Sequence, residues 1–100
     1  NNLKKDKKIN ILSDEPYFYI GTNLLANLDY NNFVTINLGI EKTEDQKNLY
    51  IKLNQLKKNE KIIYPKNYKN LQNKYVDFID TNILPIYFFE NYILGEVTKN

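Results

Sequence analysis

Apolar and polar residues alternate most regularly between residues 33 and 40, where every second residue from position 34 onward is apolar. A period of two places all the apolar side chains on one side of an extended chain, as in a strand with one buried face. The preceding residues 29–32, Asp-Tyr-Asn-Asn, favour a turn because Asn tolerates left-handed backbone and Asp bonds to its own backbone. The pattern therefore predicts a β-strand over residues 33–40.

The N-terminal part of the chain contains two shorter β-favouring runs, residues 9–12 and 17–20. Residues 13–16, Ser-Asp-Glu-Pro, separate the two runs and are typical of a turn. A hairpin or a bent pair of strands is expected. The three Leu residues between positions 24 and 28 fit either a helix of one to two turns or a continued strand.

A helix is predicted to begin near Thr43, because Thr43 and Gln46 have the spacing of a capping box. Acidic residues at positions 44 and 45 also suit the positive end of a helix dipole. An apolar stripe then follows at helical spacing, formed by Leu49, Leu53 and Leu56. We expect this helix to end near residue 58.

Residues 62–64 are apolar and precede Pro65, whose ring disfavours helical backbone in the residue before it, so a short extended segment is expected there. A second helix is predicted from residue 66 onward. Its apolar face would consist of residues at helical spacing, namely Tyr68, Leu71, Tyr75, Phe78 and Ile79.

The last segment is predicted to be a third helix that starts at Pro85, because proline is favoured at the first position of a helix. Ile86, Phe89 and Ile93 would face inward, and Gly95 would end the helix.

Strands followed by helices indicate an α+β fold. We expect a small N-terminal antiparallel sheet of about three strands packed against two or three C-terminal helices. Residues 1–8 are predicted to be a disordered basic leader, and residues 9–100 a single α+β domain.

The composition excludes much of ordinary enzyme chemistry. The chain has no Cys and no His, and all 14 basic residues are Lys. Thiolate nucleophiles, cysteine-ligated metals and imidazole acid–base catalysis are therefore absent. No catalytic residue, metal ligand or cofactor site is predicted, and we expect a protein that is not an enzyme. An enzyme using only carboxylates and Lys is the second alternative.

Aromatic residues near the C-terminus are the densest feature, and the candidate partner-binding residues there are Tyr87, Phe88 and Tyr92. On a helix Phe88 and Tyr92 would share a face, with Tyr87 about a quarter-turn from Phe88. Both a core role and an interface role are open for this segment. A second candidate group is Tyr17 and Tyr19, which would share one face of a strand.

The charge pattern gives a weaker indication. Lys4, Lys5, Lys7 and Lys8 form a basic cluster that could contact an anionic surface. The net charge of only +2 and the absence of Arg disfavour nucleic acid as the partner. A nucleic-acid- or ribosome-associated accessory protein is the first alternative.

The leading hypothesis is a protein-interaction module, an accessory domain or subunit of a larger protein or assembly, whose partner is another protein. Homo-oligomerisation is compatible with the sequence. No apolar run reaches the roughly 18 residues of a transmembrane helix. The Asn-, Lys- and Ile-rich composition suggests an AT-rich genome, and the absence of Met suggests a processed chain or a fragment. Secreted, surface and cytoplasmic locations are all compatible with it.

Overall fold

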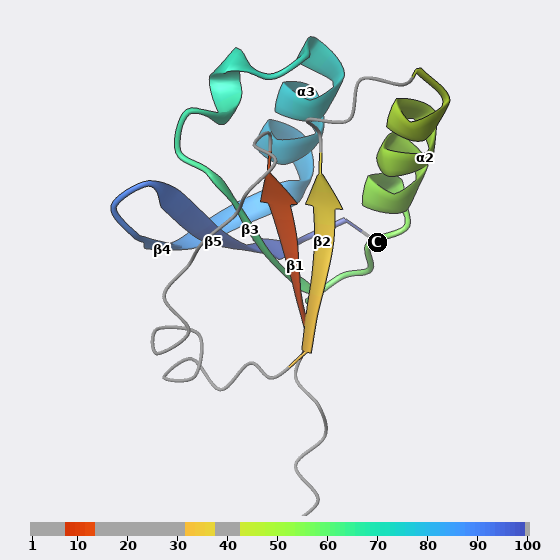
Figure 1. Ribbon diagram of the computed structural model, residues 1–100. Coiled ribbons are helices and arrows are strands. Elements are labelled where there is room, and N and C mark those ends of the chain that lie inside the picture. The colour runs from red at the N-terminus through yellow and green to blue at the C-terminus, as the bar shows by residue number, and fades with distance from the viewer. Residues whose placement is uncertain (1–7, 14–31, 38–42, 100) are drawn as a thin grey trace, which may run out of the picture.

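The computed structural model describes residues 8–13, 32–37 and 43–99 (Figure 1). Its helical and extended elements, in chain order, are β1 (Lys8–Ser13), β2 (Asn32–Asn37), α2 (Thr43–Asn54), β3 (Lys61–Pro65), the 3-10 helix η1 (Tyr68–Asn70), α3 (Asn73–Asn82), β4 (Ile83–Phe88) and β5 (Tyr92–Val97).

All five described strands form one mixed sheet in the order β2-β1-β3-β5-β4. The first strand, β1, is parallel to β2 and to β3, whereas β5 is antiparallel to β3 and to β4. Figure 1 shows the β4–β5 hairpin strongly rotated relative to β1 and β2, as the twist that accumulates across a sheet requires.

The expectation of a three-stranded antiparallel sheet followed by helices is therefore wrong. The sheet is larger and mixed, and strands alternate with helices along the chain. The physical reason lies in β1, where Ile9, Ile11 and Leu12 are buried and so apolar side chains occupy both faces of the strand. Such a strand suits the middle of a sheet with parallel neighbours, not a hairpin with one wet face.

The predicted C-terminal helix is also wrong, because its residues form β4 and β5. Proline permits an edge strand as well as a helix start, and the apolar, aromatic residues 83–88 favour the strand. Gly95, expected to end a helix, instead pairs with Pro85 across the hairpin. A Cβ at Gly95 would lie 2.4 Å from Cγ2 of Ile83, so glycine allows these strands to approach.

Other expected elements are confirmed, with changed bounds. Strand β2 confirms the predicted strand as far as residue 37, and β3 confirms the extended segment before Pro65. Helix α2 ends at Asn54, about one turn early. The second predicted helix is divided into η1 and α3. The predicted strand over residues 17–20 and the Leu-rich residues 24–28 lie outside the described residues.

Both helices lie on the same side of the sheet (Figure 1). The predicted Leu stripe of α2 is buried there and meets the apolar face of α3. Each fully buried apolar side chain contributes about 1.5–3 kcal/mol to folding. The cluster consists of Leu12, Ile36, Leu49, Leu53, Leu56, Ile62, Tyr64, Tyr75, Phe78, Ile79, Ile83, Ile93 and Val97.

The opposite side of the sheet carries a second buried cluster of Ile9, Ile11, Ile63 and Leu94, against which Phe89 and Tyr92 pack. The centre of the sheet is thus buried on both sides, whereas β4, at the edge, is not.

Candidate functional site

Strand β4 exposes a continuous run of large apolar side chains at the edge of the sheet. The exposed fraction is 55% for Leu84, 49% for Ile86, 51% for Tyr87 and 59% for Phe88. No other strand of the described part of the chain pairs with the outer side of β4. Edge strands of stable monomers usually carry charges that discourage pairing, and β4 has none.

The hydrogen-bond pattern shows which backbone groups of β4 face outward. At the hairpin end, Phe89 N donates to the carbonyl of Tyr92 over 2.8 Å. Bonded and non-bonded residue pairs alternate along an antiparallel ladder, so the next pair, Phe88 with Ile93, is a non-bonded one. The N–H and C=O of Phe88 therefore point away from β5, toward the open edge.

Pro85 occupies an equivalent outward position. At the other end of the ladder, Thr98 N donates to the carbonyl of Asn82 over 2.8 Å. Counting from this bonded pair, Pro85 and Gly95 form a non-bonded pair, so the ladder does not need the N–H that proline lacks. The register shifts between Pro85 and Tyr87, and this irregularity separates the two halves of the strand.

Three of the predicted binding residues are brought together at this hairpin, but not in the predicted arrangement. Tyr87 is opposite Leu94 and Phe88 is opposite Ile93, so their side chains lie on different faces of the sheet. Tyr92 is half-buried in β5 and packs with the second cluster. The expected shared face of Phe88 and Tyr92 does not exist, because successive strand residues alternate between faces. The rings of Tyr87 and Phe89 lie 4.9 Å apart.

The other predicted contact residues are mostly outside the described residues, namely Tyr17, Tyr19, Lys4, Lys5 and Lys7. Lys8 is described. It begins β1 with an exposed side chain and lines a pocket.

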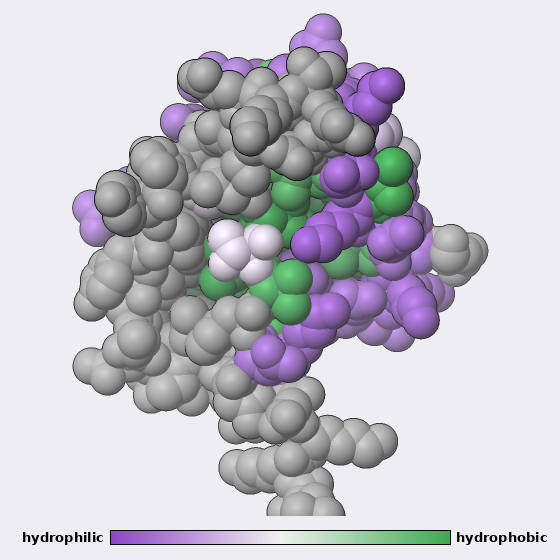
Figure 2. Space-filling model, turned by 45° about the vertical axis from the view of Figure 1, so that its right-hand side comes forward, coloured by the Kyte–Doolittle hydropathy of each residue, from purple (hydrophilic) through white to green (hydrophobic). Residues whose placement is uncertain are grey.

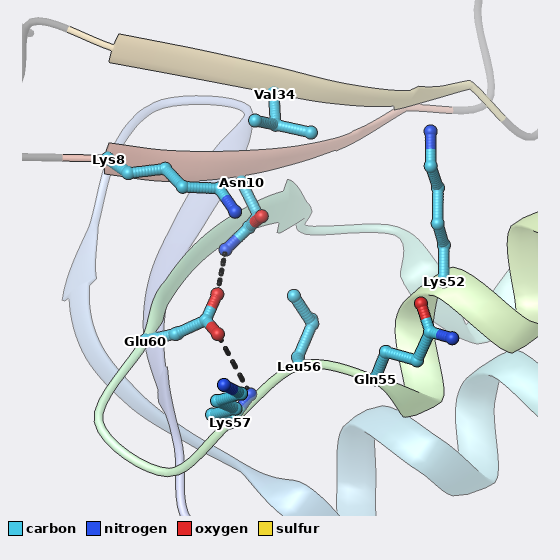
Figure 3. A pocket seen from close by; sticks show the side chains of 8 residues that line it. All are labelled: Lys8, Asn10, Val34, Lys52, Gln55, Leu56, Lys57 and Glu60. Atoms are coloured by element: carbon cyan, nitrogen blue, oxygen red, sulfur yellow. Dashed lines mark hydrogen bonds between the residues drawn. The ribbon is translucent and has the colours of Figure 1, made fainter.

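This pocket of about 610 Å³ lies between the N-terminal half of β1, strand β2 and the C-terminal end of α2 (Figure 3). Figure 2 shows the side of the molecule that carries β2 and α2, where hydrophobic surface lies beside a largely hydrophilic one. The pocket is lined by Lys8, Asn10, Val34, Lys52, Gln55, Leu56, Lys57 and Glu60. Sequence reasoning missed it, because no local pattern joins residues so far apart in the chain.

A polar cluster lies near α3. Asp80 Oδ1 accepts from Tyr68 Oη over 2.5 Å, and Asp80 Oδ2 accepts from Lys69 Nζ over 2.7 Å. The hydrogen bonds from Lys69 and Tyr68 lower the pKa of the Asp80 carboxyl. Each oxygen of Asp80 thus accepts a hydrogen bond from a neighbouring side chain. No group of three or more His, Cys, Asp or Glu residues gathers within the described ranges.

No protein-family model matches the chain, and neither does any curated protein or solved structure. Among the described helices, none is long and apolar enough to cross a membrane.

Proposed function

We propose that this protein is a non-enzymatic interaction module that binds an extended apolar segment of a partner protein along the outer edge of β4. The observation that carries the proposal is the exposure of four large apolar side chains on an edge strand. Exposed apolar surface of this kind is characteristic of binding sites, since it gains free energy when a partner removes it from water.

The arrangement of these side chains favours an added strand. Leu84 and Tyr87 pair with Glu96 and Leu94 on one face, whereas Phe88 pairs with Ile93 on the helix-covered face. A partner helix packed on one face of the sheet would leave the apolar side chains on the other face exposed to solvent. A strand added at the edge extends the sheet and covers apolar side chains on both faces, while its backbone bonds to the outward groups of Phe88.

Pro85 indicates whether the added strand comes from a second copy or from a different protein. If two copies paired through β4 about a two-fold axis, each copy would bring its own Pro85 and its own register shift into the shared pair of strands. The missing N–H and the irregularity would then both occur twice between the two copies. A partner of different sequence needs to pair only with the half of β4 beyond the shift, around Phe88. The proposed partner is therefore a different protein, and its binding segment is short and apolar.

The test begins with a displayed library of short linear peptides selected against the purified chain. The best peptide is titrated by fluorescence anisotropy against the wild type and two variants at one position. Phe88→Ala removes the side chain and keeps the N–H, and should weaken binding about tenfold. Phe88→Pro removes the outward N–H but spares the ladder to β5, and should abolish binding. Far-UV circular dichroism confirms that each variant is folded.

The matched control is Ile51→Ala, because Ile51 is 53% exposed and belongs to α2, which lies away from the β4 label in Figure 1. Peptide affinity should not change in this control. Selection of no peptide above background, or full affinity in a folded Phe88→Pro variant, contradicts the proposal. The proposal is also contradicted if sedimentation shows that the wild type is a dimer and that Phe88→Pro is a monomer. A second copy would then be the partner that covers β4.

A further inference from the structure

The pocket between β1, β2 and α2 has the make-up of a ligand site, independently of the β4 edge. Its volume of about 610 Å³ is within the usual range for small-molecule sites. The apolar side chains of Val34 and Leu56 face polar ones across it (Figure 3). This mixture is typical of sites that hold an organic ligand by its apolar part and orient it by its polar part.

A buried amide forms the polar floor of the pocket. Asn10 is only 1% exposed, and its Nδ2 donates to Glu60 Oε2 over 3.2 Å and to the carbonyl of Lys61 over 2.9 Å. The other oxygen of Glu60 accepts from Lys57 N over 3.0 Å. Figure 3 shows this chain of bonds running from β1 to the loop after α2. The floor is therefore held in place before any ligand arrives.

The lining contains three ammonium groups against one carboxylate. Glu60 already has a hydrogen bond to each of its oxygens. The ion pairs found within the described ranges, Lys61 with Glu96 and Lys69 with Asp80, involve none of the three pocket lysines. Figure 3 shows the Lys8 side chain running from β1 toward Asn10, and the Lys52 side chain extending from α2 along the opposite side of the pocket toward the strands. Both are thus positively charged groups on the lining of one pocket.

We propose that this pocket binds a small organic dianion, such as a phosphate monoester or a dicarboxylate, with an apolar part against Val34 and Leu56. Lys8 and Lys52 neutralise the anion, and the amide of Gln55 provides a further hydrogen-bonding group at the rim. Lys52 also lies in the last turn of α2, where it offsets the negative helix end that would otherwise repel an anion.

Titration of the isotopically labelled chain with phenyl phosphate, followed by NMR, tests this site. Saturable shifts of the Asn10, Gln55 and Leu56 amides are expected, with a dissociation constant of about 1 mM or below. Phthalate, a dicarboxylate of similar size, distinguishes the two classes of dianion. Phenol, which lacks the charge, and inorganic phosphate, which lacks the ring, should both bind more weakly.

Charge-matched variants decide the role of the lysines. Lys8→Gln and Lys52→Gln should each weaken phenyl phosphate binding about tenfold, because each removes a charge-assisted contact. Lys66→Gln changes the net charge equally at the far end of β3 and should have no effect beyond a small change in the overall field. Equal weakening by all three variants, or no saturable shift up to about 10 mM, would overturn the proposal.

Discussion

At the scale of single residues, Tyr64 is the most perturbed titratable group among those described. Its side chain is 2% exposed, and the ring of Tyr68 meets it edge-on with 5.3 Å between centroids. Burial, followed by the charges of Tyr68 and Asp80, raises the pKa of Tyr64 from 10.0 to about 12. The fold therefore holds this hydroxyl in its neutral form.

This shift makes stability depend on alkaline pH. Because the folded-state pKa lies above the unfolded one, the contribution of Tyr64 is complete below pH 10.0 and is lost as pH rises toward about 12. Tyr64→Phe should therefore lose less stability than the wild type between about pH 9 and about pH 11. Urea unfolding at the two pH values measures the difference. Tyr87→Phe, at a half-exposed position, is the control, and an equal change in both variants would contradict the assignment to Tyr64.

At the scale of elements, helix α2 shows that the buried face of a helix makes most of the helix's contribution to the stability of the fold. Leu53 is fully buried in the main cluster, whereas Ile51, two residues earlier, is 53% exposed. The two side chains have the same number of carbon atoms, so they differ mainly in environment. Amphipathic packing, not helix propensity, stabilises a helix of this length.

The pair gives an internal comparison. Leu53→Ala should lower the free energy of unfolding by about 2–5 kcal/mol, because it removes buried methyl groups and leaves a cavity. Ile51→Ala should change it by no more than about 0.5 kcal/mol. Chemical denaturation monitored by circular dichroism measures both. Similar losses in the two variants would mean that α2 does not pack through the Leu49, Leu53 and Leu56 stripe.

The same element shows what sequence patterns can predict. Helix α2 and strand β2 were predictable, because each has one buried face and therefore a clear period. Strand β1 was recognised, but its parallel neighbours depend on contacts far apart in sequence. Strand β4 was misread because exposed apolar residues have no period, and a proline fits an edge strand as well as a helix start. The candidate residues Tyr87 and Phe88 were found from composition, whereas the pocket needed the three-dimensional fold.

At the scale of the whole molecule, the open side of β4 raises the question of self-association. An exposed, uncharged, apolar edge would ordinarily pair with other copies. Within the described sheet, Pro85 interrupts the outward row of donors, and the register shifts directly after it. The molecule thus combines a surface suited to binding with a feature that limits binding to itself.

Restoring the backbone N–H that Pro85 lacks tests whether this proline limits self-association. Pro85→Val adds an N–H at an outward position and keeps the edge apolar, so it should increase self-association. Sedimentation velocity over a range of concentrations measures the effect. Thr81→Val adds a similar apolar side chain on the exposed surface of α3 and should leave the association state unchanged. Identical sedimentation of the Pro85→Val variant and the wild type would show that Pro85 has no such role.

The interior position of β1, between β2 and β3, has a consequence for the order in which the sheet can form during synthesis. This strand leaves the ribosome before either of its neighbours, and its pairing with β3 must wait until Ile63 has been synthesised. Its apolar side chains therefore stay unpaired through much of translation, a period in which a nascent chain is open to misassociation and chaperone capture. Without β1, strand β2 would lose its only neighbour in the described sheet and be separated from β3.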